Sequence, residues 1–483
     1  ALIRYNFLLM NTVIDEPYEN MPAEEVGLKK GDVILAIGDS SMVGKDVAYV
    51  SNHLRGDAGT TFILTIQRPS VNKKMKFKIT RRSIQLPAVP YYGVQDGGVG
   101  YLNLNSFTTG CAKDVRRAFL DMKKQGMTSL VFDLRNNGGG SLQEAVNIVN
   151  MFVPKGITLV KTVGKMERAN KEYKTTVEPI DTVMPIVVLV NDETASASEI
   201  TSGSLQDLDR AVVLGTRTYG KGLVQVSMDL PYNGNLKLTS SKYYIPSGRC
   251  IQAINYKHAN GGYTEHVPDS LTHVFHTANG REVRDGGGIK PDVEVRPDSL
   301  PNIAFYLASS GRDSTEVMWN WELQYLKKHP TIGPAKTFVI SDADFEDFKQ
   351  AVLKSGFKYD RESKKYLENL VKLAKFEGYY DDAKGEFDAL EKKLNHNLAK
   401  DLDYNKQTLK KVLTSDLVSA YYYQKGSLEN SLQFDKQWKK AVEILKNPAE
   451  YKKLLQPVVG QPLVKLEPAS NVAVDKKQKS KAK

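Results

Sequence analysis

The sequence predicts an α/β core that carries a β-rich module on its N-terminal side and a helical domain on its C-terminal side. From about residue 84 onward, buried strands alternate with amphipathic helices, as in a sheet covered by helices. Residues 12–83 contain short strands instead, and residues 340–456 are rich in Lys, Glu, Leu and Tyr at helical spacing. A chain of 483 residues is too long for one core, so we expect about three domains.

The β-rich module is predicted from its turns and its alternating strands. "VGLKKGDVILAIGD" places two glycine turns before an apolar run, while "TTFILTIQR" and "KMKFKITRR" alternate apolar and polar residues. The module resembles a PDZ domain, which adds an extended peptide to its sheet edge and captures the C-terminal carboxylate. The resemblance places the glycine-rich loop for that carboxylate just before Leu2, where the sequence starts. A β-module that serves only for packing is the alternative.

The elements of the core are predicted in chain order. "GVGYLNLNSF" indicates a strand, "AKDVRRAFLDMKKQ" a helix and "SLVFDL" a buried strand. "RNNGGG" follows as a turn that only glycine tolerates, and "SLQEAVNIVNMF" as a helix that opens with a capping box of Ser141 and Glu144. A second buried strand, "PIVVLVN", leads into "NDETASASEI" and a helix through "EITSGSLQDL". A third strand, "RAVVLG", leads into "TRTYGKGLVQV".

Composition and charge exclude several classes of protein. The net charge of +11 comes partly from the lysine-rich tail "VDKKQKSKAK", and no aromatic-interleaved basic motif accompanies it, so no nucleic-acid partner is predicted. The longest apolar run, "MPIVVLV", is far shorter than the ~18 residues of a membrane span, so we expect no integral membrane segment. The N-terminus, "ALIRYNFLLMN", lacks a start methionine and the zones of a signal peptide, which indicates a mature or trimmed form.

Ser196 is the candidate nucleophile, because it follows a buried strand in a segment of small residues. A serine hydroxyl reacts only when a neighbouring base accepts its proton. His53 lies in the β-rich module, and His329 and His396 lie in the helical part. The other four histidines lie in a loop-like segment from 254 to 285, and none forms an HExxH pair. No histidine is therefore predicted as the base.

No metal or organic cofactor is predicted either. His266, His273 and His276 cluster in the sequence, but their spacing matches no helical face, and a solvated insertion explains them better than a metal site. Cys111 and Cys250 have no metal-ligand spacing and are too few for a disulfide framework.

Lys221 is the candidate base. It lies between two glycines at the end of the strand after Ser196, and adjacent strand ends bring side chains together. A lysine with a pKa near ~10.4 stays charged at neutral pH, so burial between apolar strands must favour its neutral form. Gln225, four residues on, is placed to accept a hydrogen bond from the ammonium group and to orient it.

An oxyanion hole is predicted beside Ser196. The amide of Ala197 adjoins the nucleophile, and the amides of Gly139 and Gly140 lie in a turn at a helix N-terminus. Backbone N–H groups at such a terminus are unsatisfied and the helix dipole favours an anion. Each donor in a well-formed hole contributes roughly 3 kcal/mol to acyl transfer.

The PDZ-like module is followed by three segments in a fixed order, namely "DLRNNGGG", "TASASEI" and "TYGKGLVQ". With them, the sequence resembles the C-terminal-processing (tail-specific) serine proteases over residues 12–295. "SSKYYIPSGRCIQ" and "GGGIKPDVEV" look like the closing strands of that family. The resemblance implies a Ser-Lys dyad of Ser196 and Lys221 with Gln225 as third member, and cleavage at or near protein C-termini. It also implies a ClpP/crotonase-like α/β superhelix for the protease core.

The resemblance also sets expectations for domains, location and partners. Members are typically exported, so we expect a periplasmic or cell-envelope protein that acts on protein or peptide substrates with accessible C-termini. Helical regions that flank the core imply a homo-oligomer. The expected parts are a PDZ-like domain (1–83), a Ser-Lys protease core (84–310), a helical C-terminal domain (311–460) and a basic, disordered tail (461–483).

The sequence departs from the family pattern at two places, and three alternatives stay open. An insertion, 253–285, separates "GRCIQ" from "GGGIKPDVEV", and Glu193-Thr194 replaces the usual Gly-Ser before the nucleophile. Ser198 is the alternative nucleophile. "GTRTYGKG" approaches a phosphate-binding loop, but Gly222 lacks the hydroxyl that would hold Mg²⁺ and the next segment is a predicted strand. A PDZ-containing scaffold that binds peptides without catalysis is the third.

Overall fold

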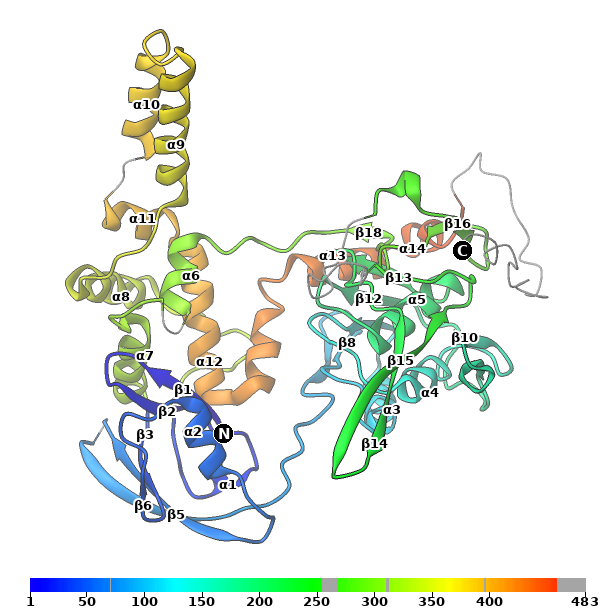
Figure 1. Ribbon diagram of the computed structural model, residues 1–483, viewed down its shortest axis with the longest axis horizontal. Coiled ribbons are helices and arrows are strands. Elements are labelled where there is room, and N and C mark those ends of the chain that lie inside the picture. The colour runs from blue at the N-terminus through cyan, green and yellow to red at the C-terminus, as the bar shows by residue number, and fades with distance from the viewer. Residues whose placement is uncertain (70, 254–266, 310–311, 395–396, 458–483) are drawn as a thin grey trace. The chain divides into compact units, whose positions relative to one another are not determined.

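The structure is a computed structural model that describes residues 1–69, 71–253, 267–309, 312–394 and 397–457 (Figure 1). It divides into two compact units. Unit 1 consists of Ala1–Gln85 and Asp298–Phe434, and unit 2 consists of Leu86–Pro297 and the chain from Asp435 onward. The segment after Phe434 thus returns to the unit that contains Ser196.

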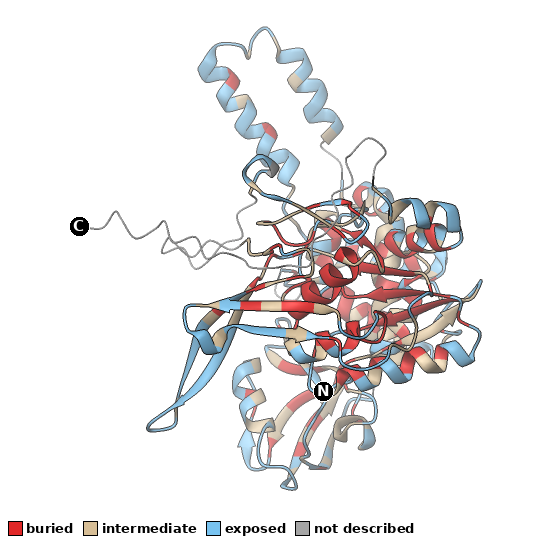
Figure 2. Ribbon diagram, turned by 90° about the vertical axis from the view of Figure 1, so that its right-hand side faces the viewer, coloured by how far each residue is buried: buried red, intermediate tan, exposed pale blue. Residues whose placement is uncertain are grey.

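A central six-stranded sheet organises unit 2. Its strands follow the order β18-β13-β12-β9-β8-β7 and are parallel apart from β7, which pairs with β8 in the antiparallel sense. Every residue of β8, β9, β12 and β13 is buried, as expected for parallel strands covered on both faces (Figure 2). The strands are β7 (Tyr92–Gln95), β8 (Val99–Asn103), β9 (Ser129–Asp133), β12 (Ile186–Val190), β13 (Val212–Gly215) and β18 (Val293–Glu294).

The described part of unit 2 contains five helices, and they confirm the predicted alternation of strands and helices. The helices are α3 (Cys111–Lys124), α4 (Leu142–Val149), α5 (Ala197–Asp207), α13 (Lys436–Leu445) and α14 (Pro448–Leu454). Helix α5 is buried along its whole length and begins where β12 leaves the sheet. Helix α13 packs against β9, β12 and β13 although it comes from the C-terminal part of the chain.

The predicted capping box of Ser141 and Glu144 is only half formed. The Ser141 hydroxyl accepts the amide of Glu144 (3.4 Å), but the Glu144 carboxylate accepts the amide of Ala112 (2.9 Å). Helix α3 begins after Gly110, which has no side chain to cap it. The prediction is wrong for Glu144 because that carboxylate caps the neighbouring helix.

A second, antiparallel sheet of unit 2 has the order β11-β10-β15-β14. Its last two strands form a long hairpin that confirms the strand predicted at "LVQVSMDL". The strands are β10 (Thr158–Gly164), β11 (Lys171–Lys174), β14 (Leu223–Leu230) and β15 (Gly234–Tyr244); two short 3₁₀ helices, η1 (Glu167–Ala169) and η2 (Asp269–Leu271), also belong to unit 2.

The predicted solvated insertion, 253–285, is packed against unit 2 in its described part. Strands β16 (Val274–His276) and β17 (Glu282–Arg284) form a hairpin there. Beside it Arg281, only 8% exposed, forms ion pairs with Asp209 (2.6 Å) and Asp292 (2.5 Å). The prediction of a solvated segment is therefore wrong for Thr277, Arg281 and Val283, which are buried, whereas Leu271, His273 and Val274 are exposed.

Unit 1 begins with the β-rich module. Its antiparallel sheet has the order β1-β2-β3-β5-β6, with β4 paired to β3. Alternate strand residues such as Ile14, Ile34 and Ile66 form its core with Val50 of helix α2. The elements are β1 (Leu2–Asn6), β2 (Asn11–Glu16), α1 (Pro22–Glu25), β3 (Val33–Ile37), β4 (Ser40–Ser41), α2 (Val47–Leu54), β5 (Thr61–Arg68) and β6 (Lys73–Thr80).

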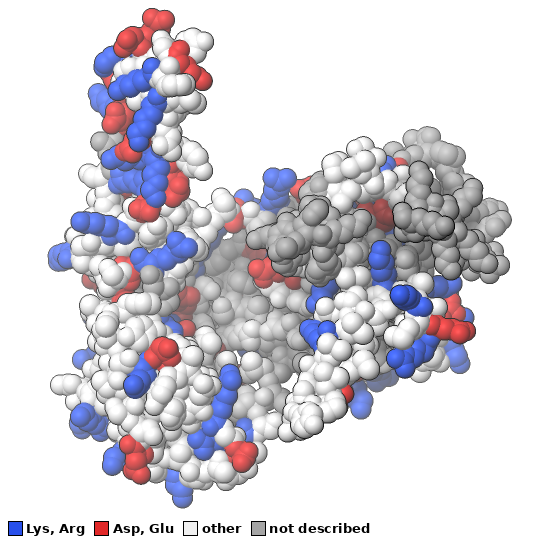
Figure 3. All heavy atoms as spheres, viewed as in Figure 1, with Lys and Arg blue, Asp and Glu red and all other residues white. Residues whose placement is uncertain are grey.

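The remainder of unit 1, Asp298–Phe434, is helical, which agrees with a helical domain in this part of the chain, but α13 and α14, which the prediction included in that domain, belong to unit 2. The helices are α6 (Asn302–Ala308), α7 (Val317–Lys328), α8 (Asp342–Ser355), α9 (Glu362–Glu377), α10 (Lys384–Leu394), α11 (Leu398–Tyr404) and α12 (Lys406–Ser431). Basic and acidic side chains alternate over the α9–α10 pair on the face drawn in Figure 3. Helix α12 is interrupted at Tyr423, whose φ is 56°.

Candidate active site

Ser196 stands at the junction between β12 and helix α5. Its backbone has φ 58° and ψ −116°, a conformation that side-chain-bearing residues rarely adopt. Such strain persists only where the surroundings enforce it, and it is concentrated at functional sites. The side chain is partly exposed, whereas Ser198 is fully buried and donates its hydroxyl to the carbonyl of Asn137 (2.9 Å). The geometry favours Ser196 over Ser198 as the reactive serine.

The predicted glycine turn lies directly against Ser196. Gly139 has φ 96°, and a Cβ atom at this position would lie 2.6 Å from the carbonyl oxygen of Ala195 and 2.8 Å from the Cβ of Ser196. Asn137 holds the two segments together, since its carbonyl also accepts the amide of Ala195 (3.0 Å). Only glycine permits this approach.

The three predicted oxyanion donors differ in their availability. The amide of Gly139 already donates to the side chain of Asn137 (2.9 Å). The amides of Ala197 and Gly140 have no hydrogen-bond partner among the residues that the structure describes. These two N–H groups are the donors that the present arrangement leaves free for an incoming oxyanion.

Lys221 begins the hairpin segment after β13 and is half-buried. Its carbonyl accepts the hydroxyl of Tyr243, which also donates to the carbonyl of Ser196 (3.3 Å). Within the described ranges, no hydrogen bond joins the Nζ of Lys221 to the Oγ of Ser196. The structure therefore brings the two backbones together without the predicted side-chain bond.

Glu199 connects these two backbones, and the sequence reasoning missed it. One carboxylate oxygen accepts the amides of Ser196 and Lys221, both at 2.9 Å, and the other accepts the hydroxyl of Thr218 (2.6 Å) and the amide of Gly220 (2.7 Å). Burial raises the pKa of Glu199, and the hydrogen bonds offset part of this effect. The pattern Ser-x-x-Glu at the start of a helix was the signal that points to it.

Gln225 lies on β14, four residues after Lys221. It is exposed on β14, where it faces Thr239 next to an irregularity in the strand register. In the part of the chain that is described, no hydrogen bond links the Gln225 side chain to Lys221. Its predicted orienting role thus stays a prediction.

The described residues contain no group of three His, Cys, Asp or Glu side chains that is able to hold a metal ion. His266 lies outside the described residues, and His273 is exposed and bonded to Asp285 (3.1 Å). Both cysteines are free thiols, and burial raises the pKa of Cys111 to about 12. Among the described helices, none is both long and apolar enough to cross a membrane.

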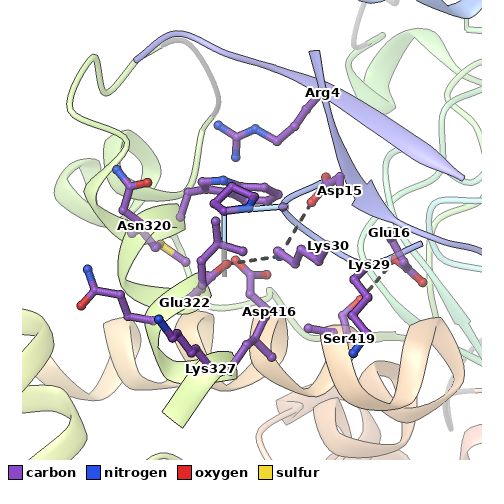
Figure 4. A pocket seen from close by; sticks show the side chains of 18 of the residues that line it. Arg4, Asp15, Glu16, Lys29, Lys30, Asn320, Glu322, Lys327, Asp416 and Ser419 are labelled. Carbon is purple, nitrogen blue, oxygen red and sulfur yellow. Dashed lines mark hydrogen bonds and ion pairs between the residues drawn. The ribbon is translucent and has the colours of Figure 1, made fainter. Parts of the chain in front are cut away.

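A pocket of about 1310 Å³ lies in unit 1, between the β-rich module and helices α7 and α12 (Figure 4). Lys30 pairs there with Glu322 (3.2 Å), and burial raises the pKa of Glu322 to about 8. Asp416 is adjacent, and Arg4 and Lys30 lie 4.6 and 4.8 Å from the ring centroid of Trp319. The predicted catalytic residues do not line this pocket.

Comparison with known proteins identifies all three parts of the chain. The pattern of peptidase family S41 matches residues 98–258, that of a PDZ domain matches residues 13–68, and that of the probable PDZ-protease C-terminal helical domain matches residues 306–445. The matches cover both units.

Curated relatives agree with these matches. A carboxy-terminal-processing protease of Bartonella bacilliformis is 38% identical over 242 residues, which is 49% of this chain and 55% of the relative. A probable CtpA-like serine protease of Staphylococcus aureus is 31% identical over 366 residues, which is 74% of this chain and 61% of the relative. The chain thus spans less than two thirds of these relatives.

Among solved structures, a photosystem II D1 C-terminal processing protease is 27% identical; the match covers 62% of this chain and 72% of that one, with a TM-score of 0.34. The family patterns and the curated relatives carry the assignment. Residues 98–258 of this chain thus match peptidase family S41, and the chain combines this match with those to a PDZ domain and to the C-terminal helical domain of PDZ-proteases.

Proposed function

We propose that this chain is a serine endopeptidase that hydrolyses peptide bonds near protein C-termini, with Ser196 as nucleophile and Lys221 as general base. The observation that carries the proposal is the strained backbone of Ser196 at the start of α5, tied through one oxygen of Glu199 to the backbone of Lys221. The names of the curated relatives support the substrate class.

The reach of the lysine side chain supports the dyad. Both amide nitrogens lie 2.9 Å from the same Glu199 oxygen, so they are separated by no more than twice that distance. A flexible four-carbon stem spans such a separation by changing rotamers. A rotamer change of Lys221 toward the Ser196 hydroxyl is the movement that the proposal requires.

The proposed reaction proceeds through an acyl-enzyme. Neutral Lys221 accepts the proton of Ser196 as the Oγ attacks the carbonyl carbon, and the oxyanion accepts hydrogen bonds from the turn and from the amide of Ala197. Lys221 then gives the proton to the leaving amine, which departs as the C–N bond breaks. Water next attacks the ester and loses a proton to Lys221, which returns it to the Oγ of Ser196 as the ester C–O bond breaks and the new C-terminus is released. Of the turn amides, Gly140 is the donor that needs no rearrangement, while Gly139 must first leave Asn137.

The remaining proposals concern the setting of this reaction. The protease core is assigned to the ClpP/crotonase-like superhelices, and the parts are assigned as residues 1–83, 84–310, 311–460 and 461–483. The protein is assigned to the periplasm or cell envelope, as a homo-oligomer, with substrates that expose their C-termini. Gln225 is proposed as the third catalytic residue, which orients the Lys221 side chain once that side chain turns toward Ser196.

Mapping the products of an unfolded polypeptide tests the proposal. We expect cleavage close to the C-terminus, measured by mass spectrometry, and no products with Ser196→Ala. Amidation of the substrate's C-terminus should slow the reaction if the free carboxylate is recognised. Binding of the peptide without any cleavage by the parent protein would instead establish the scaffold alternative.

A further inference from the structure

Arg135 connects the glycine turn to the C-terminal helix α13. It lies two residues before Asn137, and its guanidinium group pairs with Asp133 (2.6 Å) and Asp435 (2.7 Å). The same group donates to the side chain of Gln437 (2.8 Å). Arg135 is therefore held by one carboxylate from its own strand end and by two side chains from α13.

These contacts are largely buried: the side chains of Arg135 and Asp435 are 18% and 14% exposed. The side chains of Asp133, Gln437 and Trp438 are all less than a tenth exposed. Trp438 packs edge-to-face on Tyr101 (5.5 Å between centroids), and the Tyr101 hydroxyl donates to Asp133 (2.6 Å). The cluster thus differs from a surface ion pair, whose contribution is usually small.

The turn beyond Arg135 is the part of the site that faces Ser196. The side-chain NH₂ group of Asn191 donates to the Asn136 side chain (2.6 Å), and the backbone N–H of Asn136 donates to the side-chain oxygen of Asn191 (2.9 Å). The carbonyl of Asn137 accepts hydrogen bonds from Ala195 and Ser198. The serine side of the turn is thus held by residues 191–198. The start of the turn is held at Arg135, and this anchor depends on α13.

We propose that Asp435 is a positioning residue that, through Arg135, fixes the turn carrying Gly139 and Gly140 against Ser196. The inference rests on the proposed function and extends it to the segment after the helical unit. Asp435 follows directly on Phe434, the last residue of unit 1, so the anchor forms where the chain returns to unit 2. The C-terminal helix is in this sense part of the catalytic unit.

The two oxygens of Asp435 have separate tasks, which makes the idea testable. Oδ1 caps helix α13 by accepting the amides of Gln437 (2.8 Å) and Trp438 (3.1 Å), while Oδ2 pairs with Arg135. Asp435→Asn keeps an oxygen for the cap and removes the charge that holds Arg135. Asp435→Ala removes both, and Asp435→Glu restores the charge.

Asn447 provides the matched control. It caps α14, the next helix of the same segment, by accepting the amide of Glu450 (3.2 Å). Within the described residues, its hydrogen bonds do not involve Arg135. Asn447→Ala therefore weakens a neighbouring cap without touching the anchor. A loss caused merely by a destabilised C-terminal segment should appear in this variant as well.

The test compares cleavage kinetics and amide exchange in the full chain. We expect Asp435→Asn to lower kcat by about tenfold with little change in KM, Asp435→Glu to recover part of it, and Asn447→Ala to match the parent. Amides of residues 134–140 should exchange faster in Asp435→Asn, as measured by mass spectrometry, but not in Asn447→Ala.

Equal kcat and equal exchange in Asp435→Asn and the parent would overturn the inference. If the parent itself does not cleave, the proposed function fails, and the exchange of residues 134–140 still decides whether Asp435 positions the turn. Equal losses in Asp435→Asn and Asn447→Ala would also contradict a specific role for Asp435.

Discussion

Gly139 lies so close to Ser196 that a Cβ atom added to the glycine would stand 2.8 Å from the Cβ of the serine. Its φ of 96° adds a cost of about 1–2 kcal/mol for any side chain. We predict that Gly139→Ala pushes the turn away from Ser196 and lowers kcat/KM by about 10²-fold, since small misplacements at a reacting centre are that costly.

The neighbouring glycine is the control for this substitution. A Cβ atom at Gly138 would meet no atom within 4 Å. Gly138→Ala should therefore retain the parent's kcat/KM within about twofold, whereas equal activity of the two alanine variants would show that the close approach has no catalytic importance.

Ser196 and Ser198 should respond in opposite ways to alanine. Ser198→Ala removes a buried hydrogen bond to Asn137 and should lower the free energy of unfolding by about 1 kcal/mol while leaving activity measurable. Ser196→Ala removes a partly exposed hydroxyl and should abolish cleavage with no loss of stability. Denaturant titration and product analysis check both; active Ser196→Ala together with inactive Ser198→Ala would reverse the assignment.

Glu199→Gln should impair activity, although Glu199 transfers no proton in the proposed reaction. The Glu199 carboxylate accepts four hydrogen bonds. A glutamine side chain replaces one of the two oxygens with an NH₂ group, which cannot accept a hydrogen bond from the two donors that it then faces. We expect kcat to fall by at least tenfold and the protein to lose about 1–3 kcal/mol of stability. Glu193→Gln, an exposed site in the same segment, should change neither quantity by a measurable amount.

Much of this site follows from sequence patterns, and the rest depends on tertiary contacts. The buried strand before Ser196, the glycine turn and the β14 strand were all predictable because apolar runs and glycines act locally. The proposed role of Arg135 depends on α13, since its partner Gln437 lies 302 residues later in the sequence.

Two incorrect predictions have the same physical origin. Glu144 fits a local capping pattern, but its carboxylate caps α3, a different helix. The insertion was predicted to be solvated because a local sequence pattern does not reveal the ion pairs that Arg281 forms with distant residues. Local patterns report helix ends and strand faces, whereas they do not report which distant group satisfies a charge.

The charged pocket of unit 1 should make stability depend on pH. The pKa of Glu322 rises from 4.5 to about 8 on folding, because burial outweighs the attraction of Lys30, and Asp416 beside it also has a raised pKa from burial. The folded state thus binds more protons than the unfolded state between these values. The contribution of Glu322 is fully present below about pH 4.5 and is lost as pH rises through about 8.

Glu322→Gln tests that dependence. The variant should show a smaller decrease in the free energy of unfolding from pH 5 to about pH 8 than the parent, measured by denaturant titration. Glu346→Gln, on an exposed part of α8, should behave like the parent. An unchanged slope in Glu322→Gln would show that this carboxyl group does not titrate with folding.

The cleavage rate of an unfolded polypeptide by the parent, Ser196→Ala, Lys221→Ala and Lys242→Ala tests the central claim most directly. Lys242 is an exposed lysine on β15, opposite Leu223, and serves as the control for loss of a charge near the site. The account predicts that the cleavage rate falls by about 10² to 10⁴-fold or more in Ser196→Ala and in Lys221→Ala. The rate of Lys242→Ala should equal that of the parent. Parent-like cleavage by either Ser196→Ala or Lys221→Ala would contradict the account.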